Sequence, residues 1–245
     1  MQHIYTNISN KIKDLATESN SDVMIYYADL ESFPLSSEAE MNKTDREFFE
    51  YLRKNYSSEK NKKLILLIHL GGGLLKAATD LIRFLRIEYQ NSITTIVCKE
   101  ADSSASYLAL SGNTLFLNDS PSAIMSDFLP ITGHELKDYN LAKRLTEQFF
   151  DTVMNDIGAG LLACYPPNEV FTIVNRISPM YVTRTTKHEE YDYEYMENSL
   201  DGCLKPLSNH PNKTQILNLH EELLNEISKE EVKKVIILGD FHEIY

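Results

Sequence analysis

The sequence predicts an α/β fold in which helices flank a mainly parallel β-sheet. Its most informative segment is the continuous apolar run LILLIHL at 64–70, which is typical of a strand buried on both faces. A helix-like spacing of apolar residues follows, and two further strand-like segments alternate with a second helix before residue 118. Strands and helices that alternate at these lengths indicate a parallel sheet with right-handed crossovers.

The first part of the chain, residues 1–43, is expected to supply an N-terminal helix and a strand. Residues 23–30 (VMIYYADL) contain the β-branched and aromatic residues that favour strands. The sequence TDRE, which starts at Thr44, matches a capping box and predicts that a helix begins there.

The central part of the chain has the clearest pattern. Apolar residues at helical spacing from Leu74 to Leu85 predict a helix with one buried face after the run at 64–70. Residues 93–98 (ITTIVC) predict the next strand, small and apolar residues from Ala105 predict a helix, and residues 114–117 (TLFL) predict another strand. We expect these three strands to be neighbours in one sheet.

The pattern is weaker after Pro130. Apolar spacing predicts one helix over about 136–156 and another over about 216–227, and VIIL at 235–238 predicts a short strand. The chain has no repeat and no low-complexity linker. Residues 1–245 are therefore expected to form a single domain, with a C-terminal helical extension from about residue 200.

Tyrosines alternate with acidic residues near residue 190. This period of two predicts a strand with one aromatic face, formed by Tyr191, Tyr193 and Tyr195. The simplest interpretation is a half-buried edge strand or hairpin, and a surface for docking a partner is the alternative.

The composition excludes several classes of protein. The formal charge is −12 and no basic run exceeds a pair of lysines, whereas nucleic-acid binders need clustered cations. No stretch approaches the roughly 18 apolar residues of a membrane span, and no secretion signal is evident. Cys98, Cys164 and Cys203 lack disulfide or zinc spacing and are expected to be packed free thiols, which indicates a cytoplasmic protein. No metal or cofactor is expected.

Two strand-to-helix turns contain the candidate chemistry, because ligands bind at the carboxyl ends of parallel strands. The first has three consecutive glycines, Gly71 to Gly73, whose backbone can approach a ligand and direct N–H groups at an anion. The second starts a helix at Ser103, where the helix dipole favours a developing negative charge. Each turn also has a plainer interpretation, a tight turn for the glycines and a helix N-cap for the serine.

Taken together, the two turns resemble the Clp-protease/crotonase-like superfamily, most closely its serine dehydrogenase proteinase and signal peptide peptidase A branch. The segment LILLIHLGGGLLKAA at 64–78 is similar to the family's strand, paired glycines and Ala-Ala helix. The segment EADSSASYLALSGN at 100–113 is similar to its nucleophile turn. The resemblance covers residues 44–135 best. The chain departs from the family pattern at Leu70 or Gly71, at Asp102 and at Ser126.

The resemblance implies a Clp-protease/crotonase-like fold and a serine peptidase. Ser103 would be the nucleophile, and backbone N–H groups near Gly72, Gly73 and Ser104 would hold the oxyanion. Peptides or unfolded protein segments would be the substrates. Because relatives form rings, a homo-oligomer is expected.

The general base is harder to assign. Asp127 and Phe128 occupy the place of the histidine that serves as base in Clp-type enzymes. The other branch uses a lysine, which points to Lys143, with Lys137 and His134 as alternatives. Each of these side chains has the plainer interpretation of a solvated surface group.

Two other functions are consistent with the sequence. The missing histidine favours an inactive Clp-like scaffold that binds a partner. A crotonase-type acyl-thioester enzyme would use the same pair of N–H groups, but Glu100 is the sole glutamate near the second turn. For a shared oxyanion site, Gly72 and Ser103 must lie within roughly 10 Å of each other, because the N–H donors have to reach one substrate oxygen.

Overall fold

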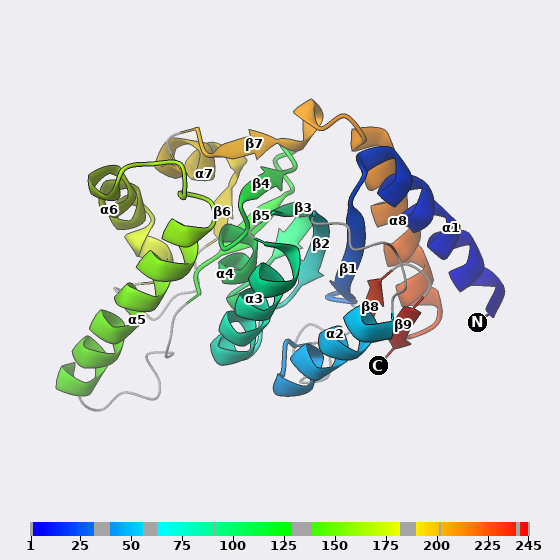
Figure 1. The fold of residues 1–245 in the computed structure, drawn as a ribbon, viewed down its shortest axis with the longest axis horizontal. Coiled ribbons are helices and arrows are strands. Elements are labelled where there is room, and N and C mark those ends of the chain that lie inside the picture. The colour runs from blue at the N-terminus through cyan, green and yellow to red at the C-terminus, as the bar shows by residue number, and fades with distance from the viewer. Residues whose placement is uncertain are drawn as a thin grey trace.

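The computed structural model describes residues 2–31, 40–55, 63–90, 92–128, 139–181, 190–200, 202–238 and 241–244. Within these residues the protein is a mixed α/β structure built on one sheet of nine strands (Figure 1). The strands are β1 (Asp22–Ala28), β2 (Leu64–Leu70), β3 (Ile93–Ala101), β4 (Thr114–Leu117), β5 (Ile124–Ser126), β6 (Glu190–Asp192), β7 (Leu204–Pro206), β8 (Lys234–Leu238) and β9 (Phe241–Ile244).

The strand order is β6-β5-β3-β2-β1-β8-β9, and β4 pairs with both β3 and β7. Strands β1, β2, β3 and β4 are parallel, with Leu66 opposite both Met24 and Thr95. The prediction that 64–70, 93–98 and 114–117 are neighbours in a mainly parallel sheet is therefore confirmed. Strand β8 runs antiparallel to β1, and β7 pairs with β4, so the C-terminal segment contributes strands as well as a helix.

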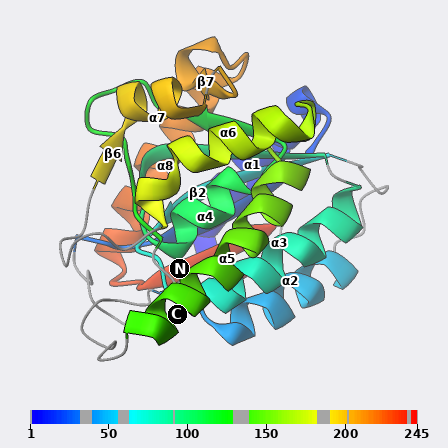
Figure 2. The same cartoon turned by 90° about the vertical axis from the view of Figure 1, so that its left-hand side faces the viewer.

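Helices cover both faces of the sheet. One face is covered by α1 (Gln2–Ser19) and α8 (Lys213–Lys229), which lie side by side in Figure 1. The other face is packed against a larger set, which Figure 2 shows: α2 (Lys43–Asn55), α3 (Leu75–Tyr89), α4 (Ser104–Leu110), α5 (Tyr139–Ala159), α6 (Pro167–Arg176) and α7 (Tyr193–Leu200). Every residue of β2 is buried, because side chains on both faces of the strand enter a core.

The two cores divide β2 between them. Leu64, Leu66 and Ile68 join the core under α2 to α7. Ile65 and Leu67 join the core under α1 and α8. This division explains why the strand is apolar throughout instead of alternating.

The capping prediction at residue 44 was wrong by two positions. Helix α2 begins at Lys43, and the side chain of Asn42 accepts the Thr44 N–H at 2.9 Å. Asp45 reciprocates by accepting the Asn42 N–H at 2.8 Å, so the capping box is formed by Asn42 and Asp45. Asparagine and threonine are both favourable N-cap residues, so the sequence alone does not distinguish Asn42 from Thr44 as the cap.

The tyrosine-rich segment is a strand only in part. Residues Glu190–Asp192 form β6 at the edge of the sheet, and α7 starts at Tyr193. The Asp192 carboxylate accepts the Tyr195 N–H at 2.9 Å and caps the new helix. The rings of Tyr191 and Tyr195 still meet, with centroids 4.6 Å apart, because the turn into the helix brings them together.

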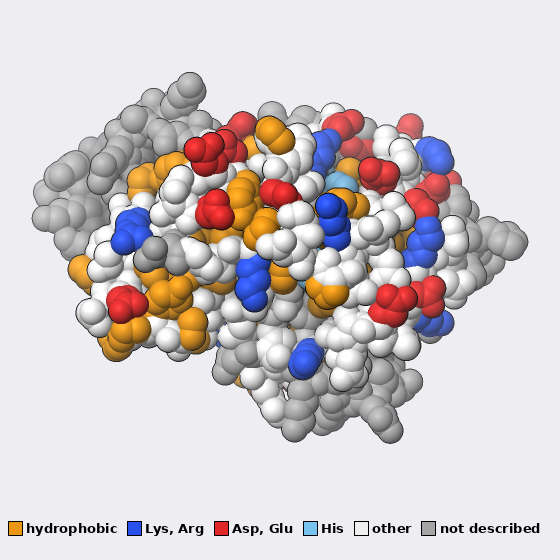
Figure 3. Space-filling model, turned by 90° about the horizontal axis from the view of Figure 1, so that it is seen from above, with side chains coloured by type: hydrophobic (Ala, Val, Ile, Leu, Met, Phe, Trp, Pro, Cys, Tyr) orange, Lys and Arg blue, Asp and Glu red, His pale blue; other side chains and the backbone are white. Residues whose placement is uncertain are grey.

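Among the described helices, none has the combined length and hydrophobicity needed to cross a membrane. Acidic and basic side chains are interspersed on the face shown in Figure 3, without a continuous basic patch. The three cysteines are free, but the expectation that all are packed is wrong for Cys164, which is exposed.

Two buried histidines occupy the core under α8. The rings of His69 and His220 have centroids 5.6 Å apart, and His220 Nδ1 lies 3.0 Å from the Tyr27 hydroxyl. Burial, with smaller contributions from His220 and Lys99, lowers the pKa of His69 from 6.5 to about 3. Burial, followed by Lys99, lowers the pKa of His220 to about 4. Both imidazoles are therefore neutral at physiological pH.

These histidines make stability sensitive to acid. As pH falls below about 6.5, the unfolded chain binds protons that the native imidazoles do not bind, so the free energy of unfolding falls until the native pKa values are reached. We expect His220→Gln to reduce this slope by up to about 1.4 kcal/mol per pH unit, because one such group is removed. Urea unfolding between about pH 7 and pH 4.5 measures the slope. Equal slopes for the variant and the parent protein would contradict the prediction.

Candidate active site

Ser103 lies in the tight turn between β3 and α4 and is partly exposed. Its backbone has φ 48° and ψ −119°, a conformation that is costly for a residue with a side chain. It occupies the N-cap position of α4, but its hydroxyl makes no capping hydrogen bond. The plainer interpretation of Ser103 as an ordinary cap therefore fails, and the hydroxyl is available for other interactions.

The strained turn is held by Ser126, which ends β5. The Ser103 N–H donates to Ser126 Oγ at 2.7 Å, and Ser126 Oγ donates in turn to the Asp102 carboxylate. The Ser126 N–H donates to Ser106 Oγ at 2.9 Å, which fixes the strand end against α4. The sequence marked Asp102 and Ser126 only as departures from the family pattern. Their contact depends on the pairing of β5 with the end of β3, for which the sequence had no signal.

Ser126→Ala should destabilise the protein by about 1–3 kcal/mol, because it leaves the part-buried Ser103 N–H and the Asp102 carboxylate without this partner. Ser126→Thr should recover much of the loss, because it keeps the hydroxyl. Ser122→Ala is the matched control: Ser122 is exposed in the same segment and should change stability by less than about 0.5 kcal/mol. Chemical denaturation of the three variants tests this, and equal effects of Ser126→Ala and Ser122→Ala would contradict it.

The glycine loop lies directly against Ser103. Gly72 and Gly73 have φ values of 95° and 127°, which favour glycine. A Cβ atom placed on Gly72 would lie 2.7 Å from Ser103 Cβ and 3.4 Å from Ser103 Oγ. The two turns are thus brought together at one edge of the sheet, well within the expected separation.

The loop is fixed from outside by Met41. The Met41 N–H donates to the Gly72 carbonyl at 2.7 Å, and the Leu74 N–H donates to the Met41 carbonyl at 2.9 Å. These two bonds form an isolated parallel bridge between Met41 and Gly73. The glycines therefore make the tight turn of the plainer interpretation, and they also allow the loop to approach Ser103 closely, as a catalytic loop requires.

The backbone N–H groups of Gly72, Gly73 and Ser104 have no hydrogen-bond acceptor among the described residues. By contrast, the Ser103 N–H is already occupied by Ser126. The Ser104 side chain is buried, and its Oγ also has no partner in the described part of the chain. Donors that have no internal acceptor beside a partly exposed hydroxyl can bind an anion that forms on an attacked carbonyl.

The side chains of the three candidate bases are not among those that the structure describes. Lys143 belongs to α5, but its side chain lies outside the described ones, and Lys137 and His134 lie outside the described residues. Asp127, which stands in the place of the Clp-type histidine, is buried next to Ser126. Among the residues that the structure describes, no histidine or lysine side chain is hydrogen-bonded to Ser103, and no group of three metal-binding side chains is close enough to hold an ion.

Helix α5 is anchored to α3 and α4 at its C-terminal end. The Asp156 carboxylate accepts hydrogen bonds from Arg86 of α3, at 3.2 Å, and from the Tyr107 hydroxyl of α4. Because Tyr107 is one turn after Ser103, α5 is held against the same helix that carries the serine. Lys143 lies at the opposite end of α5 from this anchor.

Comparisons with known proteins identify solved structures of similar fold. No protein-family model matches the sequence, and no curated protein matches it. Among solved structures, the chain is similar to a peptidase from Plasmodium falciparum, with 13% identity, a TM-score of 0.42, and coverage of 76% of this chain and 95% of that one. It is also similar to a structure described as an enzyme, with 12% identity, a TM-score of 0.40, and coverage of 72% and 90%.

Proposed function

We propose that this protein is a serine hydrolase of Clp-protease/crotonase-like fold that cleaves peptide bonds through Ser103. One observation carries the proposal: Ser103 has a strained backbone with an uncapped, partly exposed hydroxyl, and Gly72 lies against it. Strained serines in strand-to-helix turns present their hydroxyl at the sheet edge in known hydrolases. Gly72 and Gly73 would place N–H groups beside that hydroxyl.

The reaction is acyl transfer. Ser103 Oγ attacks the substrate carbonyl carbon and loses its proton to a base, and the carbonyl oxygen becomes an oxyanion. The N–H groups of Gly72 or Gly73 and of Ser104 stabilise that charge. Collapse of the intermediate expels the amine, which takes up the proton, and water then releases the acyl group and restores the hydroxyl.

We assign the base to Lys143, with Lys137 and His134 as the alternatives. Lys143 belongs to α5, the helix whose other end contacts α3 and α4. A lysine can accept the serine proton only if its pKa is depressed, and burial beside the substrate would do this. Lys143→Met keeps most of the stem and removes the amine, so it should abolish turnover in folded protein. Unchanged turnover would move the assignment to Lys137 or His134.

Reaction with a fluorophosphonate probe tests the nucleophile. The parent protein should be labelled at one serine, Ser103→Ala should not be labelled, and the exposed control Ser122→Ala should be labelled like the parent. Peptide mapping by mass spectrometry identifies the modified residue. No labelling of folded parent protein, or equal labelling of Ser103→Ala, would reject the hydrolase and favour a scaffold that binds a partner.

The wider assignments follow from the same proposal. Peptides or unfolded protein segments are the proposed substrates, and a cytoplasmic homo-oligomer is the proposed form. Size-exclusion chromatography with light scattering measures the oligomeric state, and peptidase assays on unfolded and folded forms of one substrate protein test the preference.

A further inference from the structure

The glycine loop beside Ser103 is connected, through Met41, to a buried ion pair. Lys234 of β8 and Asp45 of α2 have side chains that are 0% and 1% exposed, and Lys234 Nζ lies 2.8 Å from Asp45 Oδ1. Both charges lose their hydration on burial, so a pair of this kind is weak evidence for stability by itself. The groups that the pair contacts are therefore the better guide to its role.

The ion pair holds the backbone on both sides of Met41. Lys234 Nζ donates a hydrogen bond to the Glu40 carbonyl at 3.0 Å. Asp45 Oδ2 accepts the Asn42 N–H at 2.8 Å. Both chain neighbours of Met41 are thus bound to the same two side chains, and Met41 itself is only 1% exposed. Loss of the pair would free the backbone before and after Met41.

Met41 in turn holds the loop on both sides of Gly73. The Met41 N–H donates to the Gly72 carbonyl at 2.7 Å, and the Met41 carbonyl accepts the Leu74 N–H at 2.9 Å. The Gly72 carbonyl and the Gly73 N–H belong to one planar peptide unit and point in opposite directions, because the peptide is trans. The bond to the carbonyl therefore fixes the direction of the Gly73 N–H, a donor of the proposed oxyanion site.

We propose that Lys234 and Asp45 are positioning residues for the reaction at Ser103. They hold Met41, and Met41 orients the Gly72–Gly73 peptide beside the serine. This inference rests on the proposed hydrolase function. Oxyanion donors stabilise the transition state only from close range, and a misplacement of about 1 Å can slow a reaction about a hundredfold. The ion pair therefore contributes to the rate of the reaction through the loop.

Amide hydrogen exchange, followed by NMR spectroscopy, tests the connection without a measurement of activity. The amides of Met41 and Leu74, here called the bridge amides, report on the two bonds that hold the loop. In Lys234→Met they should exchange about tenfold faster or more than in the parent protein, because the segment that carries Met41 opens locally.

The double variant Lys234→Met with Asp45→Asn separates positioning from stability. It should be more stable than Lys234→Met, because no uncompensated charge is left in the core. Exchange of the bridge amides should nevertheless remain fast, because Glu40 still lacks its donor. Recovery of slow exchange in the double variant would overturn the proposal. If Lys234→Met does not fold, the double variant is compared directly with the parent protein.

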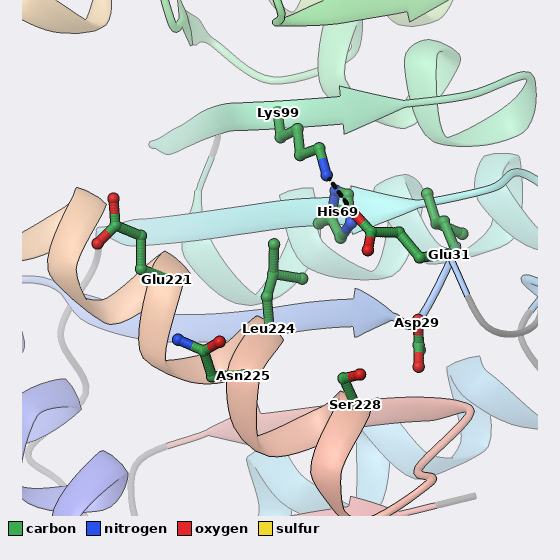
Figure 4. Close-up of a pocket in the computed structure, with 9 residues that line it drawn as sticks. Asp29, Glu31, His69, Lys99, Glu221, Leu224, Asn225 and Ser228 are labelled. Atoms are coloured by element: carbon green, nitrogen blue, oxygen red, sulfur yellow. Dashed lines mark hydrogen bonds and ion pairs between the residues drawn. The ribbon is translucent and has the colours of Figure 1, made fainter.

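Leu223→Ala is the matched control, on the opposite face of the sheet. Leu223 belongs to α8 and is 1% exposed in the core under α1 and α8. Figure 4 shows this face, where the next residue, Leu224, lines a cavity that Met41 and the ion pair do not line. Loss of a buried leucine side chain lowers overall stability. It should accelerate the bridge amides much less than Lys234→Met does, and equal acceleration by the two variants would overturn the proposal.

The kinetics of fluorophosphonate labelling test the consequence for the reaction. In Lys234→Met the maximal rate of labelling at Ser103 should fall about tenfold or more. The probe concentration that gives half of this rate should stay close to that of the parent protein, because the oxyanion donors act on the transition state and not on the bound probe. Folded Leu223→Ala should label at the parent rate.

The outcomes separate this inference from the hydrolase itself. If the parent protein is labelled and folded Lys234→Met labels at the same maximal rate, the hydrolase stands and the positioning role is wrong. If the parent protein is not labelled, the hydrolase is wrong and the positioning role falls with it.

Discussion

Lys234→Met should destabilise the protein by about 3–5 kcal/mol, the usual cost of leaving one member of a buried ion pair without its partner. Lys234 Nζ lies 2.8 Å from Asp45 Oδ1, and the two side chains are 0% and 1% exposed. Lys234 also donates to the Glu40 carbonyl at 3.0 Å, and Asp45 accepts from the Tyr26 hydroxyl. Removal of the ammonium group leaves the carboxylate charged in the core.

Two comparisons separate the buried charge from other effects. Lys229→Met makes the same change in a surface pair with Glu226, at 3.0 Å and 67% exposure for the lysine, and should cost less than about 1 kcal/mol. Lys234→Met combined with Asp45→Asn should be more stable than Lys234→Met alone, because the uncompensated charge is gone. Urea unfolding measures all three, and equal losses for Lys234→Met and Lys229→Met would contradict the prediction.

Gly73→Ala should lower the stability of the protein by a similar amount, and it should also disturb the candidate active site at Ser103. A Cβ atom on Gly73 would overlap the backbone nitrogen and oxygen of Met41, and its φ of 127° is unfavourable for alanine. Backbone atoms cannot move aside cheaply, so the bridge between Met41 and Gly73 should open. We expect a loss of about 3 kcal/mol or more and slower fluorophosphonate labelling of Ser103.

Gly202→Ala is the matched control for backbone strain. Gly202 has a positive φ of 80°, but nothing lies within 4 Å of an added Cβ atom. It should therefore cost only about 1–2 kcal/mol and leave labelling unchanged. If both glycine variants lose the same stability and label at the same rate, the overlap with Met41 has no special effect.

The centre of the sheet was predictable because β1 and β2 are buried on both faces. The apolar run of β2 and the helical spacing after it are local signals, and the structure places both where the sequence predicts. The closeness of Gly72 and Ser103 was also predictable, because both turns follow parallel strands that pair directly. The change from strand to helix at Tyr193 was not predictable. Asp192 can either end a strand or cap a helix, and the surrounding structure determines which of the two it does.

The supports of the site were hidden from the sequence. Ser126 reaches Ser103 through the pairing of β5 with β3, and Lys234 reaches Asp45 through the antiparallel pairing of β8 with β1. Such contacts join residues of ordinary type that are far apart in the chain. A lone serine or lysine has no periodic signal, so only the assembled sheet identifies its role.

The Lys234–Asp45 pair also imposes an order on biosynthesis. Asp45 precedes its partner by 189 residues, which a ribosome takes roughly 10 to 40 s to add at about 5–20 residues per second. Until β8 emerges and pairs with β1, docking of α2 would bury a lone carboxylate, so Asn42 and Met41 lack their final anchor. The bridge from Met41 to Gly73 is therefore completed late, and a nascent chain carries Ser103 for some time before the glycine loop beside it is firmly held.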